Sequence, residues 1–426
     1  MSTRNSTVKV AGAVASLALA ASMVTASPAH AATVSVERIA GADRYATSAQ
    51  VSTKNFEPGV GTLFVASGED YPDALAAGAV AGQKKAPLLL VKKGEIPGAV
   101  SAEIDRLKPQ SIVIVGGEGA VSDDVRSQLA DKSASVKRVA GVNRYETASL
   151  LSNQNFGIDT PFAFVASGAS FPDALSASSA GALAGGPVLL TPRVGLPAST
   201  GVELERLDPR HILVVGGSSA IADSTAREAY EYRVQDAGRF AGADRYGTAA
   251  AVLRAVLPTT KDTVFIASGA NYPDALAGVS AAAVHGAPVF IVPANGVSTQ
   301  ICTEVRRVQP KKIVVLGGSG AVSDASVNAV VDCAGQSPLI QEATGGTKAI
   351  TEAPGGPTAP APTPTPTVPV PGGDTPPAVG TVTCASFQTQ AQAQAYYDYW
   401  LERGYADRFG LAADGSGLAC GHLQFQ

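Results

Sequence analysis

The sequence predicts an α/β fold made of three tandem repeats, each containing a parallel β-sheet covered by helices. The same motifs return at offsets of 100 and 101 residues, so the copies fill the chain from about Val34 to about Gln336. Within a copy, short runs of Val, Leu and Ile alternate with Ala-rich or amphipathic stretches, as buried parallel strands alternate with crossover helices. A period of this length is a domain-sized unit rather than one layer of a solenoid.

The first copy illustrates the elements expected in all three. Its strands are apolar runs that end near glycine or a polar turn, and they comprise Leu63–Ala66, Pro87–Val91 and Ile112–Val115. Its helices are the stretches that follow these strands, and they comprise Asp73–Gly82, Ala99–Leu107 and Asp123–Ala130. The predicted order is therefore βαβαβα, which implies right-handed crossovers with helices on both faces of the sheet.

Each copy opens with the motif R-x-A-G-x-[DN]-R-Y. Its Asp or Asn is a residue type that favours the N-cap, so we expect a helix to begin at the next arginine. An arginine is unfavourable at the positive end of a helix dipole and needs a partner elsewhere. That partner is either an aspartate at an interface between copies or an anionic ligand. The three arginines are Arg44, Arg144 and Arg245.

The second motif, A-S-G-x-x-[YF]-P-D-A-L, contains a recurrent aspartate. It follows three residues after a residue type that caps helices, namely Asp70, Ser170 or Asn271. This spacing predicts a capping box, in which the aspartate reaches back to a free backbone N–H. The alternative is that the aspartate contacts a ligand. The aspartates concerned are Asp73, Asp173 and Asp274.

A pair of glycines ends the third expected strand of every copy. Backbone N–H groups at such a turn can hold an anion, and ligands of open parallel sheets bind at the carboxyl ends of the strands. The candidate binding positions are Gly117, Gly217 and Gly318. The segment lacks the third glycine of the G-x-G-x-x-G nucleotide-binding motif.

Motifs of common hydrolases are missing from the sequence. There is no H-E-x-x-H, no G-x-S-x-G and no cysteine with a matching histidine, and the three histidines after residue 31 fall at unrelated positions of the repeats. Repeated acids and arginines without a repeated histidine or cysteine favour binding over catalysis. The sequence thus predicts a protein that is not an enzyme.

Residues 1–31 have the pattern of an export signal. Arg4 and Lys9 precede an apolar run, and Ala29-His30-Ala31 has the form of a cleavage site. Cleavage there would change the formal net charge from −4 to −6, because the segment carries two positive charges and no acidic residue. This balance argues against nucleic-acid binding, and no later apolar stretch approaches the ~20 residues of a membrane span.

After the third copy the composition changes abruptly. Residues 354–377 hold ten of the 28 prolines, which suits an extended spacer. The last stretch regains aromatic residues and contains two of the four cysteines. Four cysteines allow three pairings, and the most economical keeps each bond within one module. These pairs would be Cys302–Cys333 and Cys384–Cys420, whereas no spacing suits zinc.

The repeated motifs resemble the cell wall-binding repeat of type two. The resemblance rests on R-x-A-G-x-[DN]-R-Y, on A-S-G-x-x-[YF]-P-D-A-L and on the V/L-G-G turn, and covers about 300 residues. It implies three Toprim-like or flavodoxin-like domains in a pseudo-threefold arrangement within a monomer. It also implies non-covalent anchoring of a secreted protein to an anionic polysaccharide or a teichoic-acid-like polymer in the wall of a Gram-positive bacterium.

The tail resembles the excalibur domain, an extracellular calcium-binding module. The acidic loop of that family is reduced here to Asp414 and Ser416, with Ala412 and Gly421 at two of its acidic positions. Calcium takes six to eight oxygen ligands, so this loop implies weak calcium binding or none, and we expect no other cofactor. The tail is expected to be a small, α-rich, disulfide-linked module.

The chain thus divides completely into expected segments. They are the signal peptide (1–31), repeats one to three (32–135, 136–236 and 237–337), a Pro/Thr/Gly-rich linker (338–380) and the excalibur-like domain (381–426). The predicted function is anchoring at the cell surface, with presentation of the small C-terminal module. The alternatives are an amidase-like wall hydrolase and a calcium-dependent adhesion protein.

Overall fold

The computed structural model describes residues 34–233, 235–257 and 260–335 of the chain. Within these residues strands and helices alternate without exception. The first repeat contains β1 (Ser35–Ile39), α1 (Arg44–Asn55), β2 (Thr62–Ser67), α2 (Pro72–Gln83), β3 (Leu88–Val91), α3 (Gly98–Leu107), β4 (Ser111–Val115) and α4 (Asp123–Ala130).

The other two repeats follow the same order. The second contains β5 (Val136–Val139), α5 (Arg144–Asn155), β6 (Phe162–Ser167), α6 (Phe171–Ala184), β7 (Val188–Thr191), α7 (Ala198–Leu207), β8 (His211–Val215) and α8 (Asp223–Tyr230). The third contains β9 (Asp236–Phe240), α9 (Arg245–Val256), β10 (Thr263–Ser268), α10 (Pro273–Val284), β11 (Val289–Val292), α11 (Thr299–Val308), β12 (Lys312–Leu316) and α12 (Asp324–Ala334).

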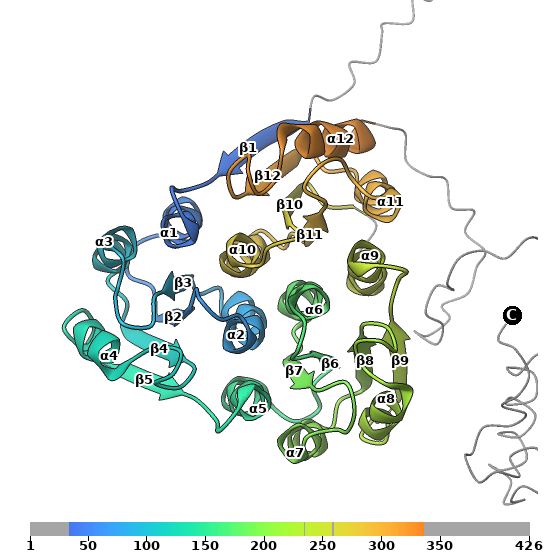
Figure 1. The fold of residues 1–426 in the computed structure, drawn as a ribbon, viewed down its shortest axis with the longest axis horizontal. Helices are drawn as coiled ribbons and strands as arrows, with labels where there is room; N and C mark the ends of the chain where they lie inside the picture. The colour runs from blue at the N-terminus through green and yellow to red at the C-terminus, as the bar shows by residue number, and fades with distance from the viewer. Residues whose placement is uncertain (1–33, 234, 258–259, 336–426) are drawn as a thin grey trace, which may run out of the picture. The chain divides into compact units, whose positions relative to one another are not determined.

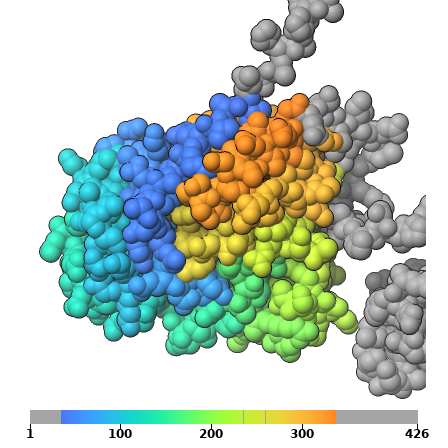
Figure 2. All heavy atoms as spheres, turned by 45° about the horizontal axis from the view of Figure 1, so that its top comes forward, coloured from blue at the N-terminus to red at the C-terminus, as the bar shows by residue number. Residues whose placement is uncertain are grey.

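Three parallel four-stranded sheets form the framework, and each takes its last strand from a different repeat. The sheet of repeat 1 has the order β3-β2-β4-β5, and that of repeat 2 has the order β7-β6-β8-β9. The third sheet closes the ring, because β1 pairs with β12 in register from Ser35 with Lys312 to Ile39 with Leu316. Figure 2 shows the blue N-terminal segment against the orange end of the described chain.

The predicted parallel α/β repeats are therefore confirmed, and the helix expected at the opening motif forms as α1, α5 and α9, but each repeat also has a fourth strand. The additional strand ends inside the opening motif R-x-A-G, with the arginine as its next-to-last residue. Its arginine fastens it to the neighbouring glycine turn: Arg38 donates to the carbonyls of Gly317 (3.0 Å) and Val322 (2.9 Å) and to the Asp324 carboxylate (2.8 Å). Arg138 and Arg239 bind the corresponding turns of repeats 1 and 2.

Helices α2, α6 and α10 pack together at the centre of the three repeats (Figure 1). Small residues allow this close approach. A Cβ atom on Gly78 would lie 2.5 Å from the Ser178 hydroxyl, and one on Gly82 would lie 2.5 Å from the Cβ of Ala182. The Ala-rich composition of these helices thus serves helix packing, since they are buried around most of their circumference.

An aromatic cluster lies at the start of the three central helices. The rings of Tyr71, Phe171 and Tyr272 have centroids 5.2–6.0 Å apart, and each touches the other two. The hydroxyl of Tyr71 donates to the Ala169 carbonyl (2.8 Å), and that of Tyr272 donates to the Glu69 carbonyl (3.0 Å). The cluster therefore holds three repeats together at one point.

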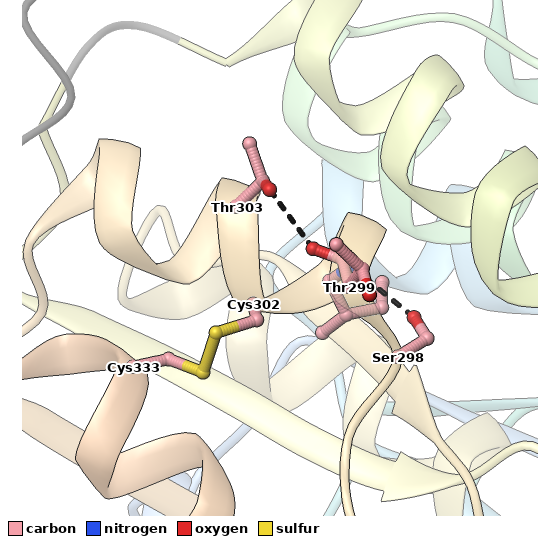
Figure 3. The surroundings of a disulfide bond; sticks show 6 residues. Ser298, Thr299, Cys302, Thr303 and Cys333 are labelled. Carbon is pink, nitrogen blue, oxygen red and sulfur yellow. Dashed lines mark hydrogen bonds between the residues drawn. A yellow bond between two sulfur atoms is a disulfide. The ribbon is translucent and has the colours of Figure 1, made fainter.

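A disulfide joins α11 to α12 within repeat 3 (Figure 3). Cys302 and Cys333 have Cα atoms 5.3 Å apart, and the bond matches the pairing expected from the sequence. The second expected pair, Cys384–Cys420, lies outside the described residues. So do the signal peptide, the linker, the excalibur-like domain and its residues Asp414 and Ser416.

Candidate functional site

The candidate residues of all three motifs come together where one repeat meets the next. We call these places junctions 1–2, 2–3 and 3–1. Each combines an aspartate and the second glycine of the turn from one repeat with an arginine and a threonine from the following repeat. The sets are Asp73, Gly117, Arg144 and Thr147; Asp173, Gly217, Arg245 and Thr248; and Asp274, Gly318, Arg44 and Thr47.

Junction 2–3 encloses a cavity of about 300 Å³. The end of β8 and the start of α6 form one side, and the start of α9 forms the other. The lining residues are Ser170, Pro172, Asp173, Gly217, Ser219 and Ala220 from repeat 2, and Gly242, Ala243, Asp244, Arg245 and Thr248 from repeat 3. The cavity thus lies at the carboxyl ends of parallel strands, where such sheets bind ligands.

The helices that bring the arginines to the junctions are capped as expected. The Asp43 side chain accepts the N–H of Ala46 (2.7 Å), and Asp244 accepts that of Gly247 (2.8 Å). In repeat 2, Asn143 accepts the N–H of Glu146 (3.0 Å). These bonds fix the first turn of α1, α5 and α9 and so position the arginine next to each cap.

Among the described residues no aspartate forms a direct ion pair with these arginines, although the arginine lowers the pKa of the aspartate at each junction. Instead, each arginine donates Nη1 to the carbonyl after the second strand of its own repeat. The bonds are Arg44 to Gly68 (2.6 Å), Arg144 to Gly168 (2.7 Å) and Arg245 to Gly269 (2.6 Å). A guanidinium has five N–H donors, so this bond anchors the side chain and leaves donors for a further acceptor.

Two of the arginines also contact the central aromatic cluster. The Arg44 guanidinium lies 5.9 Å from the centre of the Tyr272 ring, and that of Arg245 lies 5.9 Å from the centre of the Phe171 ring. Each contact crosses a junction, because the ring belongs to the preceding repeat. Such cation–π contacts help to hold the guanidinium in place while keeping its charge.

The capping-box interpretation of the recurrent aspartates was wrong. Helix α2 begins after Tyr71 and α10 after Tyr272, and no side chain accepts a capping hydrogen bond at the start of α2, α6 or α10. The proline at the first turn has already removed one N–H that would need a cap. The Asp73 carboxylate instead lies against the glycine turn, with Oδ2 2.6 Å from where a Cβ of Gly116 would be.

The electrostatics of the aspartates follow from this burial. Desolvation raises the pKa of all three carboxyls, and that of Asp173 reaches about 6. The positive charge of Arg245 and the Thr248 hydroxyl lower the pKa of Asp173, but they do not compensate for its burial. Each junction therefore contains a carboxyl that protonates more readily than an exposed one.

The two glycines of each turn have different roles. The first adopts a positive φ, +121° at Gly216, and a Cβ there would lie 2.7 Å from Oδ2 of Asp173. Only glycine suits such a position. The second glycine faces open space: a Cβ on Gly117 or Gly318 meets nothing within 4 Å, and one on Gly217 only the Ser219 hydroxyl at 4.0 Å. The fold therefore does not require the candidate binding glycines to be glycine.

Sequence reasoning missed two recurrent groups. The threonines Thr47, Thr147 and Thr248 lie in the junctions, and each accepts the N–H of the glycine in R-x-A-G. The first arginine of that motif, exemplified by Arg38, secures the exchanged strand. Recurrence at a fixed position in all three copies was the signal available for both.

The described part of the chain has no group of three or more His, Cys, Asp or Glu side chains that could hold a metal ion. Among the same residues, no helix combines the length and the apolar character that crossing a membrane requires. What the junctions offer is guanidinium groups, a glycine turn and the first turn of a helix, which together suit an anion.

Residues 38–126, 138–226 and 239–327 each match the family described as cell wall binding domain 2. The chain belongs to this family. It therefore carries a cell-wall-binding function and is associated with the cell wall or surface. The three matches begin at Arg38, Arg138 and Arg239, the first residue of the opening motif.

Two solved structures share the fold. Cwp6 from Clostridium difficile aligns with a TM-score of 0.67 and 25% identity, over 72% of this chain and 49% of that protein. Cwp8 from the same organism aligns with a TM-score of 0.64 and 26% identity, over 71% and 52%. In each case the shared region covers only about half of the Clostridium difficile protein.

Curated relatives come from Bacillus subtilis strain 168. The N-acetylmuramoyl-L-alanine amidase LytC is 27% identical over 294 residues, which is 69% of this chain and 58% of the amidase. An amidase enhancer is 26% identical over 296 residues, which is 70% of this chain and 40% of the enhancer. The chain thus spans only about half the length of these relatives, and its likeness to the amidase lies in the binding repeats.

Proposed function

We propose that this protein is exported, remains at the surface of a Gram-positive bacterium and binds an anionic wall polymer through the junctions between its repeats. The polymer is an anionic polysaccharide or a teichoic-acid-like chain, and binding is non-covalent. In this proposal residues 1–31 direct export, and the protein presents residues 381–426, an excalibur-like module that follows the linker 338–380, at the cell surface. The chain itself is not an enzyme, and it acts as a monomer.

The convergence at junction 2–3 carries this proposal. Arg245 and the turn at Gly217 lie on the same cavity of about 300 Å³, and the first turn of α9 reaches it at Asp244. Free guanidinium and backbone N–H donors recognise phosphate or carboxylate groups at such a place. The same residue types recur at the other two junctions, so a polymer with repeated anionic groups can engage more than one of them. Linked weak sites then give firm retention.

The direct experiment is co-sedimentation of the purified protein with purified Gram-positive walls. We expect the protein to pellet with intact walls and to stay in the supernatant after the anionic polymers have been extracted. Retention that is unaffected by the extraction would contradict the choice of polymer. It would leave peptidoglycan itself as the ligand.

A triple substitution tests the junctions without disturbing the fold. Aspartate in place of Gly117, Gly217 and Gly318 brings a negative charge to each junction, where a new side chain has room. The matched control places asparagine, of nearly the same size, at the same three positions. We expect the aspartate variant to lose wall retention and the asparagine variant to keep most of it. Equal retention by both would place the polymer elsewhere.

The alternative function is that of an amidase-like wall hydrolase, and it draws on the relative LytC. Since that likeness lies in the binding repeats, it gives no support for catalysis by this chain. Release of soluble peptide or sugar from walls by the purified protein would establish the hydrolase. Retention that requires added calcium and is abolished by a chelator would support the calcium-dependent adhesion protein instead.

A further inference from the structure

The three junctions are related by the repeat but differ in the charges that they carry themselves. The clearest difference is at the third position of the helix that brings the arginine. That position is Glu146 in junction 1–2, Gly247 in junction 2–3 and Ala46 in junction 3–1. Junction 1–2 thus has a carboxylate at this position, while its helix cap is the neutral Asn143 and the other two caps are Asp43 and Asp244. The number of carboxylates on the turn is the same in all three junctions, and what differs is where the carboxylate lies.

The Glu146 carboxylate occupies a backbone donor of its own junction. Its Oε2 accepts the N–H of Val142 at 2.7 Å. The corresponding N–H groups belong to Ala42 and Ala243, and neither donates a hydrogen bond to any of the described residues. Ala243 lines the cavity of junction 2–3. In junction 1–2, therefore, a carboxylate of the protein holds a donor that the other two junctions leave open to an anion.

One further difference acts in the same direction. Ser170 lines the cavity of junction 2–3, and its counterparts are Asn271 in junction 3–1 and the charged Asp70 in junction 1–2. The negative charge of Asp70 raises the pKa of Asp73 and so acts inside junction 1–2. At the position of Ala243, junction 1–2 has Val142, which is 91% exposed and adds no contact that closes the junction.

Junction 3–1 has an acidic neighbour of its own, Glu69, but this carboxylate has a different partner. Its Oε2 accepts the N–H of Lys93 (3.2 Å) on the loop after β3. The residue at the same position of repeat 3, Ala270, is not part of the cavity lining in junction 2–3. Glu69 comes directly after Gly68, whose carbonyl Arg44 binds. Its carboxylate does not occupy the backbone N–H groups that are open to an anion in this junction.

We propose that the anionic groups of the polymer are held at junctions 2–3 and 3–1, and that Glu146 and Asp70 close junction 1–2 to them. This inference rests on the proposed function. Arg144 then serves the fold alone, through its bond to Gly168. The chain offers two neighbouring anion sites that share repeat 3, rather than three equivalent sites. A polymer chain would follow this side of the ring of repeats.

Single aspartate substitutions at the open glycines test the assignment, with purified walls as the probe. We expect G217D and G318D each to weaken retention by about tenfold or more, because one of two linked sites is lost. G117D should retain wild-type binding, since its junction already excludes anions. The asparagine variants G117N, G217N and G318N are the size-matched controls. Weakening by G117D equal to that by G217D would overturn the inference.

Exchanging the closing residues between junctions gives the converse test. The variant D70N/V142A/E146A gives junction 1–2 the residues of junction 3–1, and A42V/A46E/N271D does the reverse. Each substituted residue already occurs at the same position of another repeat, so the fold has a precedent for it. We expect the first variant to gain retention by about threefold or more and the second to lose it. No gain in the first would count against closure by these residues.

The two tests separate this inference from the proposed function. If all three single aspartate variants bind as the wild type does, and the triple variant does too, the junctions do not bind the polymer. If the triple variant loses binding while the three single variants are equally weakened, the junctions bind but are equivalent. Circular dichroism and thermal unfolding of each variant show whether a loss of binding reflects a loss of fold.

Discussion

The carboxyl group of Asp173 is expected to make stability depend on pH, and replacing it with asparagine tests this. The side chain lies in junction 2–3 against the turn at Gly216, between two repeats. Burial raises its pKa to about 6, against 3.8 for an unperturbed aspartate. The asparagine variant keeps the shape of the side chain but cannot ionise.

The size and sign of the effect follow from this shift in pKa. The folded protein holds the proton more tightly than the unfolded chain, so folding becomes less favourable as the pH rises through 6. A difference of about two pH units corresponds to about 3 kcal/mol of unfolding free energy. The cost is complete above the folded pKa and vanishes below pH 3.8, where both states are protonated.

The assay is urea unfolding of the wild type and of Asp173→Asn at pH 4, 5, 6, 7 and 8. Between pH 4 and pH 8, the stability of the variant relative to the wild type should rise by about 2.5 kcal/mol, with most of the change between pH 4 and pH 6. The contributions of other titrating groups to the unfolding free energy are the same in both proteins and cancel in this comparison. A difference that stays constant with pH would refute the explanation by burial.

Three further predictions concern stability and can be checked by urea unfolding. Gly216→Ala should cost about 3 kcal/mol or more, because its φ is positive and its Cβ would meet a carboxylate, whereas Gly217→Ala should change stability by less than about 1 kcal/mol. Replacing Cys302 and Cys333 together with serine should cost about 3 to 4 kcal/mol, and reduction of the wild type should reproduce the loss. Asp43→Ala removes the cap of α1 and should cost about 1 kcal/mol.

The repeat and the class of each element could be predicted because local patterns dictate them. Leu88–Val91 is a short apolar run and forms a strand buried on both faces, and Asp123–Ala130 forms the helix that Ser122 caps. The helix caps at Asp43 and Asp244 also follow from residue type alone. In each case neighbours in the sequence determine the outcome.

The exchange of strands between repeats could not be predicted in the same way. Ser35–Ile39 contains three polar residues among five and is partly exposed, so it lacks the apolar run that marks a buried strand. Its place at the edge of a sheet, beside β12, explains this composition. Pairing over 277 residues depends on the closure of the whole ring, and no local pattern reports that closure.

The candidate site, like the fold, could be predicted from the sequence only in part. The spacing of the recurrent aspartate was compatible with a capping box, but Pro72 at the first turn and the approach of the next repeat direct the carboxylate elsewhere. The arginine also donates to a carbonyl of its own repeat, a contact that the opening motif did not predict. Both outcomes depend on tertiary contacts. Recurrence identified which residues the three repeats share, but it could not say what they touch.

The net charge of the chain constrains how it can hold an anionic polymer. With a formal charge of −4, the chain as a whole would repel a polyanion. Salt screens this repulsion at distances beyond about 10 Å. Attraction must therefore arise from a few donors that contact the polymer directly. In such a balance a carboxylate of the protein that occupies a backbone donor weakens the hold of that junction on an anion. If Glu146 closes junction 1–2 in this way, repeats of one fold have unequal shares in binding.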